Sequence, residues 1–316
     1  MGIMYNTALV YRSFGEPQTV LQAETTALAP LPAGQVRVKM RFAPVNASDV
    51  IPVTGAYSHR ITLPAVAGYE GVGVVTETSG SDAHLLGKRV LPLRGQGTWQ
   101  QYVDCPAELV VPVPDDIDDT LAARAYINPL AAQMMLERYP AHGQHVLVTA
   151  AGSDCAGYLA QWARGQGAKS VTGIYRSAIH ASRLAACGVI PLADTDSAAI
   201  KRAAEKASVI YDATGGTLAE TLLQSMPKTG QFISYGLLSG QPFSIRQRLP
   251  AVHWFHVRNY LDAMTADSWQ QAFCTLWERL RITPVSEVTL TDFQHWRQAI
   301  TLYQTPGRIA KPLLSF

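Results

Sequence analysis

The stretch that decides the fold is residues 146–163, VLVTAAGSDCAGYLAQWA. An apolar run comes first, then a loop of small residues, then a segment with helical apolar spacing. Strand, glycine loop and helix in this order are typical of a dinucleotide-binding domain, where backbone N–H groups and the positive helix end face a pyrophosphate. The loop GSDCAG keeps Gly152 and Gly157 of a GxGxxG pattern, and Asp154 adds a carboxylate to it.

The segments after this loop alternate between strand and helix patterns. We expect strands in KSVTGIY (169–175), ASVIYDAT (207–214) and GQFISYG (230–236), with helices around 178–187 and 217–225. Alternation of this kind requires crossover connections between parallel strands. The sequence therefore predicts an α/β domain with a doubly wound parallel sheet.

The two ends of the chain have a different pattern. Residues 1–120 contain short alternating runs separated by Gly, Pro, Asn and Asp, which indicates a compact β-rich barrel or sandwich. From about residue 266, two helical stretches alternate with the strand patterns PVSEVTL and IAKPLLSF. We therefore predict a split β-rich domain (1–120 and 266–316) and an inserted nucleotide-binding domain (121–265).

Composition excludes several classes of protein. Charged residues make up 16% of the chain, the net charge is 26 − 24 = +2, and no Lys/Arg run occurs, which disfavours a nucleic-acid partner. No apolar stretch approaches the ~18 residues of a membrane span, and the start lacks a signal pattern, so we expect a cytoplasmic protein with no membrane partner. The four cysteines form no CxxC pair, which argues against a disulfide framework or a structural zinc site.

The end of the expected strand 169–175 bears on the choice of cofactor. An acidic residue about 20 positions after the first glycine binds the ribose 2′-hydroxyl of NAD. Here the strand ends in Tyr175 and Arg176, and 176 − 152 = 24. A guanidinium at this place suits a 2′-phosphate through charge-assisted hydrogen bonds, so the sequence favours NADPH over NADH.

Taken together, the motifs resemble the medium-chain dehydrogenase/reductase superfamily over essentially the whole chain. Within it the zinc-free branch is most similar, namely quinone oxidoreductases and mitochondrial-type trans-2-enoyl thioester reductases. The resemblance implies a GroES-like catalytic domain and a Rossmann cofactor domain. It is carried by YRSFGEPQTV (11–20), APVNASDVIPVTGAY (43–57), LPAVAGYEGVGVV (63–75), GTWQQYV (97–103), INPLAA (127–132), the glycine loop and GQFISYGLLSGQP (230–242).

The zinc branch would place metal ligands at three positions of this sequence. It would need a thiolate at Asn46, an imidazole at Tyr69 and a second thiolate near Ile127. None of these residues can supply such a ligand, so we expect no catalytic metal.

Without a metal, hydride delivery to a conjugated carbonyl leaves an enolate that needs a hydrogen-bond donor and a proton. Tyr57, in TGAY, matches the tyrosine to which this role is ascribed in the enoyl reductase family. A water molecule is the alternative proton donor. By the same matching, the resemblance implies a set of cofactor-binding residues. They are Asn46, Asn128, Gly152, Ser153, Asp154, Cys155, Ala156, Gly157, Tyr175, Arg176, Tyr235, Gly236, Leu237, Leu238, Tyr260 and Lys311.

The sequence thus predicts an NADPH-dependent reductase of an activated double bond in a small molecule, such as a 2-enoyl thioester or a related enone. An NADPH:quinone oxidoreductase is the near alternative. A protein that binds the nucleotide without turnover, with a regulatory role, is the alternative of another class, because fold does not guarantee activity. The resemblance also implies a homodimer formed through an edge strand near residues 231–245.

Overall fold

The computed structural model describes residues 2–246, 248 and 250–316. The chain divides into two compact units, each of which we describe by itself. Unit 1 consists of Met1–Ile127, Thr265–Ile282 and Glu287–Phe316, and unit 2 of Asn128–Met264 and Thr283–Ser286.

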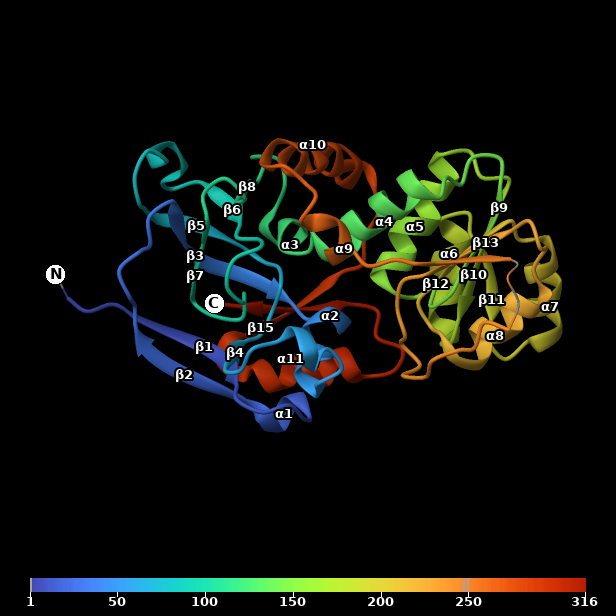
Figure 1. The fold of residues 1–316 in the computed structure, drawn as a ribbon, viewed down its shortest axis with the longest axis horizontal. Helices are drawn as coiled ribbons and strands as arrows, with labels where there is room; N and C mark the ends of the chain where they lie inside the picture. The colour runs from blue at the N-terminus through green and yellow to red at the C-terminus, as the bar shows by residue number, and fades with distance from the viewer. Residues whose placement is uncertain (1, 247, 249) are drawn as a thin grey trace. The chain divides into compact units, whose positions relative to one another are not determined.

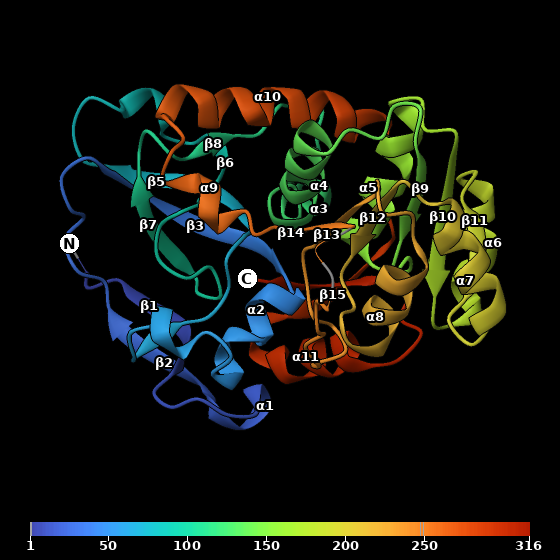
Figure 2. The same cartoon turned by 45° about the vertical axis from the view of Figure 1, so that its right-hand side comes forward.

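Unit 2 is built on a fully parallel sheet with the strand order β11-β10-β9-β12-β13-β14. Its strands are β9 (His145–Val148), β10 (Ser170–Tyr175), β11 (Ile190–Ala193), β12 (Val209–Asp212), β13 (Gln231–Ser234) and β14 (Ala251–Trp254). The order runs outward in both directions from β9, the strand that precedes the glycine loop, so the predicted doubly wound α/β fold is confirmed. Strand β11 forms one edge of the sheet, beside β10 (Figure 2).

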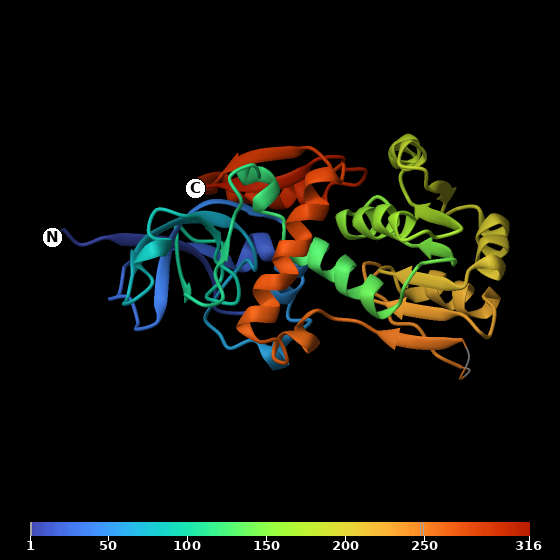
Figure 3. The same ribbon diagram turned by 90° about the horizontal axis from the view of Figure 1, so that it is seen from above.

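Helices cover both faces of this sheet (Figures 1 and 3). The helices of unit 2 are α4 (Ile127–Arg138), α5 (Asp154–Gly165), α6 (Ala181–Ala186), α7 (Ser197–Lys206) and α8 (Gly216–Ser225), with a 3₁₀ turn η4 (Ala178–His180) before α6 and the short α9 (Arg258–Leu261) apart from the sheet. Leu147, Ile210 and Phe232 of neighbouring strands pack with Leu222 of α8 into one buried cluster. Because the strands are buried on both faces, they are continuous apolar runs in the sequence rather than alternating ones.

The position of the sheet edge differs from the sequence prediction. We expected an edge strand near 231–245, but β13 is internal, and the free edge belongs to β14. Strand β13 pairs with β12 on one side and β14 on the other, and the segment after it is irregular from Tyr235 to Arg246.

Unit 1 is β-rich and holds two sheets. The larger has the order β15-β16-β3-β5-β6-β8, with β7 also paired to β3, and the smaller has the order β2-β1-β4. The strands are β1 (Tyr5–Tyr11), β2 (Leu21–Ala27), β3 (Gln35–Pro44), β4 (Ala65–Val66), β5 (Val72–Thr78), β6 (Arg89–Leu91), β7 (Tyr102–Pro106), β8 (Val111–Pro112), β15 (Val288–Asp292) and β16 (Lys311–Ser315).

The helical elements of unit 1 are mostly short. They are α1 (Pro17–Val20), α2 (Ala47–Val50), α3 (Asp119–Ala122), α10 (Ala266–Ile282) and α11 (Trp296–Gln304), with 3₁₀ turns η1 (Pro52–Thr54), η2 (Ser58–Arg60), η3 (Ala83–Leu85) and η5 (Phe293–His295).

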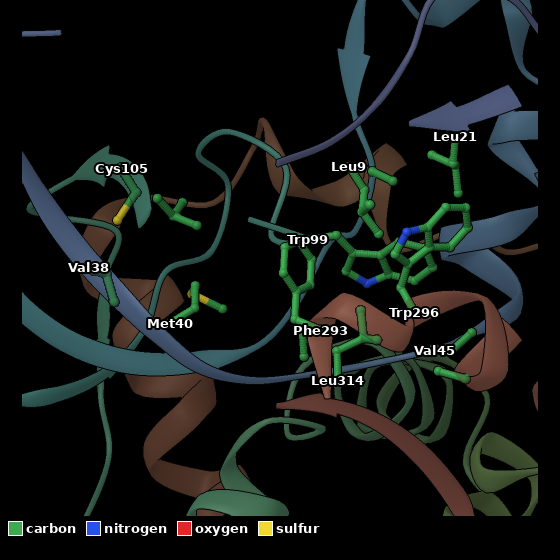
Figure 4. Packing of buried hydrophobic residues seen from close by; sticks show 14 of the residues in the cluster. Leu9, Leu21, Val38, Met40, Val45, Trp99, Cys105, Phe293, Trp296 and Leu314 are labelled. Atoms are coloured by element: carbon green, nitrogen blue, oxygen red, sulfur yellow. The ribbon is translucent and has the colours of Figure 1, made fainter. Parts of the chain in front are cut away.

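The core of unit 1 joins residues from both ends of the chain. Trp99 and Trp296 belong to one buried cluster with Leu9 and Leu21 (Figure 4). Strand β16 lies between β15 and β3, so the C-terminal residues complete the larger sheet.

The unit boundaries differ from the predicted ones by a few residues, for identifiable reasons. Residues 121–127 belong to unit 1 because the Glu70 carboxylate accepts the N–H groups of Tyr126 and Ile127. Residues 283–286 belong to unit 2 because the indole of Trp162, on α5, donates to the Thr283 hydroxyl at 2.9 Å. No described helix in residues 2–246, 248 and 250–316 is both long and apolar enough to cross a membrane.

Candidate functional site

In unit 2 the turn between β9 and α5 is built around Gly152. Ala150 adopts a left-handed conformation (φ 48°), which turns the chain sharply out of the sheet. Ser153 then caps α5 by accepting the N–H of Ala156 on its hydroxyl oxygen at 3.4 Å. The positive end of this helix therefore opens directly beside Gly152, and such helix ends attract anions.

His180 explains why a glycine stands at position 152. A Cβ atom on Gly152 would lie 2.5 Å from the imidazole Cδ2 of His180, which is buried against the turn. Arg183 adds a hydrogen bond to the Gly152 carbonyl at 3.3 Å. Neither His180 nor Arg183 was singled out from the sequence, because the packing contact of His180 and the hydrogen bond of Arg183 each reach the turn across about thirty residues.

Gly157 lies elsewhere than the loop pattern implied. It belongs to the first turn of α5 rather than to the turn before it, because the Ser153 cap starts the helix at Asp154. A Cβ on Gly157 would meet nothing within 4 Å. The Asp154 carboxylate, which we expected near the phosphates, accepts a hydrogen bond from the Ser286 hydroxyl at 3.1 Å.

A hollow in unit 2 lies against this helix start. Its lining combines the beginning of α5 with α6 and with the returning segment 283–286 that the sequence analysis missed. The lining residues include Ser153, Asp154, Gly157 and Gln161 of α5, Arg183 and Cys187, and Pro284, Val285 and Ser286.

Three of the residues matched to the cofactor site meet although they come from three elements. The Cys155 thiol, on α5, donates to the backbone carbonyl of Asn128, on α4, at 3.8 Å. Tyr235, directly after β13, places its buried hydroxyl near Cys155. Burial, with smaller effects from Cys155 and Asp212, raises the pKa of Tyr235 well above its ordinary value, so this hydroxyl stays neutral.

Residues matched to the site also follow the carboxyl ends of the other parallel strands. Tyr175 ends β10, and Arg176 extends from it as an exposed side chain. Gly236, Leu237 and Leu238 continue from Tyr235, and Leu237 and Leu238 are 44% and 48% exposed. Because all strands of this sheet are parallel, their carboxyl ends share one edge, where open α/β sheets bind ligands.

Tyr260 lies in a separate aromatic cluster of unit 2. Its ring stacks on Phe255, with ring centroids 5.4 Å apart, and carries the Arg138 guanidinium 3.8 Å above its centroid.

In unit 1, Asn46 and Lys311 belong to a buried polar cluster. The Asn46 amide donates to the Glu70 carboxylate at 2.7 Å, and the Lys311 ammonium donates to the Asn46 side-chain oxygen. Asp49 accepts the backbone N–H groups of Asn46 (2.8 Å) and Tyr69 (3.0 Å). Asn46, Asp49, Glu70 and Lys311 are each at most 3% exposed.

This cluster gathers the positions at which the zinc branch would place its ligands. Asn46, Tyr69 and Ile127 surround Glu70 and Asp49, the carboxylates the sequence analysis missed. Burial raises the pKa of Glu70, and burial together with the nearby Glu70 raises the pKa of Asp49 to about 7. Among the described residues, no group of three or more His, Cys, Asp or Glu side chains is placed to hold a metal ion.

Tyr57 lies in unit 1, between the turns η1 and η2. The chain reverses at Gly55 (φ 95°), where a Cβ would lie 3.0 Å from Phe14. The buried Pro52 and Val53 anchor this reversal, and the half-buried Tyr57 has the Arg60 guanidinium 5.8 Å from its ring centroid.

Comparisons with known proteins agree with this architecture. The family model of the alcohol dehydrogenase GroES-like domain matches residues 32–115. Mitochondrial enoyl-[acyl-carrier-protein] reductase of Xenopus tropicalis is 30% identical over 250 residues (75% of this chain, 71% of that protein), and the human one is 27% identical over 310 residues (91% and 83%). A solved structure from Bacillus thuringiensis, of a protein assigned as an NADPH:quinone reductase, is 33% identical, covers 99% of both chains and has a TM-score of 0.91.

Proposed function

The chain belongs to the zinc-independent medium-chain dehydrogenase/reductase superfamily, in the branch of enoyl thioester reductases and quinone oxidoreductases, and we propose that it is an NADPH-dependent reductase of activated C=C bonds. The leading substrate class is a 2-enoyl thioester or a related enone. The observation that carries the proposal is the meeting of Asn128, Cys155 and Tyr235 beside the Ser153-capped helix of unit 2.

The residues of unit 2 fit a dinucleotide. Gly152 and the start of α5 provide an anion-binding turn for the pyrophosphate, and the exposed Arg176 provides a cation for the 2′-phosphate. The Tyr235 hydroxyl, held neutral by burial, and the backbone of Gly236 to Leu238 offer an uncharged wall suited to a nicotinamide ring.

Bound NADPH supplies a hydride to the β-carbon of the double bond. The side chain of Tyr57 carries the O–H group that this step needs. That O–H donates a hydrogen bond to the enolate oxygen or the proton to the α-carbon, and a water molecule is the alternative donor. Asn46 and Lys311 were matched to the cofactor site, and in unit 1 both side chains are held in the buried cluster with Glu70.

The test follows NADPH consumption with a medium-length 2-enoyl-CoA and, in parallel, with a simple quinone. Faster turnover of the enoyl thioester supports the leading substrate class. Turnover of the quinone alone assigns the protein to the quinone oxidoreductases. The likeness to the Bacillus thuringiensis structure supports this alternative. Silence with both acceptors leaves the substrate unidentified, and tight NADPH binding with no turnover of any acceptor would favour the non-catalytic alternative.

We extend the proposal to a homodimer formed through the free edge of β14, where Trp254 is 52% exposed. Light scattering on the purified protein tests it, and a monomeric mass contradicts it. The cytoplasmic location stays a prediction of the sequence, since the named relatives are mitochondrial enzymes.

A further inference from the structure

A buried hydrogen-bond pair lies beneath the loop that follows β13. Asp212, the last residue of β12, is fully buried, and the hydroxyl of Thr149, directly after β9, donates to its Oδ1 at 2.6 Å. The two residues are 63 positions apart and lie at the carboxyl ends of the neighbouring parallel strands β9 and β12. Neither was singled out from the sequence, and neither takes part in the proposed chemistry.

This pair fixes the turn after β12. Oδ1 of Asp212 accepts the N–H of Thr214 at 3.1 Å and Oδ2 accepts that of Gly215 at 2.9 Å, while the Thr149 hydroxyl oxygen accepts the N–H of Ala213 at 2.9 Å. Three consecutive amides are therefore held by two side chains. Burial raises the pKa of Asp212, while the three hydrogen bonds that its oxygens accept favour the ionised carboxylate.

The turn at residues 213–215 also holds the loop after β13, which we propose lies against the nicotinamide. The carbonyl of Ala213 accepts the N–H of Leu238 at 2.8 Å, and that of Thr214 accepts both the N–H (3.0 Å) and the hydroxyl (2.6 Å) of Ser239. Gly215 fits the junction closely: it has φ +72°, and a Cβ there would lie 2.5 Å from Leu237 Cδ2. The two loops thus form one hydrogen-bonded assembly anchored on Asp212.

We infer that Thr149 and Asp212 are positioning residues for hydride transfer, which set the height and tilt of the Tyr235–Leu238 wall without touching cofactor or substrate. The inference rests on the proposal that this wall contacts the nicotinamide. Misplacing reacting groups by about 1 Å can cost about 100-fold in rate, so loss of the anchor should affect kcat more than NADPH affinity.

The experiment compares Thr149→Val, which keeps the shape and removes the hydroxyl, with Thr149→Ser, which keeps the hydroxyl. Thr221→Val is the matched control, because Thr221 is a half-buried residue on α8 whose hydroxyl donates to the Thr217 carbonyl of the same helix. Each protein is titrated with NADPH by fluorescence, which gives the dissociation constant and the number of binding sites. The value of kcat per binding site is then measured with NADPH and with NADPH that carries deuterium at the transferred position. We expect Thr149→Val to lose about 10-fold or more in kcat per site, with a larger deuterium isotope effect and an NADPH dissociation constant within about 3-fold of wild type. Thr149→Ser and the control should stay near wild type.

Ser239→Ala gives a second reading in case Thr149→Val does not fold. Ser239 is exposed, so its loss is tolerated by the core, but it removes one link between the two loops. We expect a smaller fall in kcat and the same rise in isotope effect. If a folded Thr149→Val or Ser239→Ala variant has the wild-type kcat and the wild-type isotope effect, the inference is overturned. If the wild-type protein itself does not bind NADPH, the proposed function is contradicted instead.

Discussion

The imidazole of His180 lies against the Cα of Gly152, so close that a methyl group on Gly152 would sit 2.5 Å from Cδ2 and 2.6 Å from Nε2 of the ring. A buried ring cannot yield this space without moving the turn. We therefore expect Gly152→Ala to lower the free energy of unfolding by about 1–3 kcal/mol and to weaken NADPH binding.

Urea denaturation and fluorescence titration with NADPH measure the two effects. The control is Gly165→Ala, at the end of α5, where an added Cβ meets nothing within 4 Å. Equal behaviour of the two alanine variants would show that His180 does not support the turn.

Arg176→Ala tests the cofactor preference. A charge-assisted hydrogen bond to a phosphate contributes about 1.5–3 kcal/mol, so NADPH should bind roughly 10- to 150-fold more weakly while NADH binding stays unchanged. Arg202→Ala, on the exposed face of α7, is the control for loss of a surface charge. If Arg176→Ala weakened the binding of NADPH and of NADH equally, Arg176 would not bind the 2′-phosphate.

Tyr57→Phe tests the proton donor. Removal of a general acid typically costs 10²- to 10⁴-fold, so we expect kcat with the enoyl substrate to fall by about 100-fold while the NADPH dissociation constant is kept. The exposed Tyr5, on β1, offers the same chemical change as a control. Undiminished turnover in Tyr57→Phe would assign protonation to water.

Asp49 makes stability depend on pH. Its pKa is raised from 3.8 to about 7 in the folded protein, mainly by burial and next by Glu70, so between these values the folded chain holds a proton that the unfolded chain has released. The contribution of Asp49 is therefore most favourable below about pH 4 and is lost as pH rises through 7. It amounts to at most about 4 kcal/mol.

Denaturation of the wild type and of Asp49→Asn at pH 5 and pH 8 measures this contribution. The wild type should lose stability between the two values, and Asp49→Asn, which cannot ionise, should lose less. Parallel slopes for both proteins would assign the pH dependence to other groups.

The sequence predicts the architecture well where the structural signal comes from residues that are close in the chain. The apolar run of β9, the small-residue turn and the helical spacing of α5 follow directly from neighbouring residues, and so does the alternation that builds the parallel sheet. The sequence motifs also predicted a pyrophosphate-binding turn at Gly152 and a 2′-phosphate contact at Arg176, at the end of β10.

Supporting residues were missed because their partners are distant in sequence. Thr149 meets Asp212 across 63 positions and Glu70 meets Asn46 across 24, and neither pair has a fixed spacing that a motif could carry. A signal did exist for Asp212, since an acidic residue ending an apolar strand before Thr-Gly-Gly must find donors when it is buried. The edge strand near 231–245 was inferred from the family resemblance and not from the residues, and in the structure β13 is internal with β14 outside it.

The split of unit 1 has a consequence for its synthesis. The ribosome completes Asn128–Met264 while the larger sheet of unit 1 still lacks β16, which lies between β15 and β3. Unit 2 can therefore close around its own strands as it emerges, whereas Phe42–Pro44, the end of β3 beyond its pairing with β7, wait without their partner until Leu313–Ser315 arrive. Exposed strand edges are sites of unwanted pairing, so the nascent chain is most vulnerable to aggregation in this interval, and β3 is the segment a chaperone would need to shield.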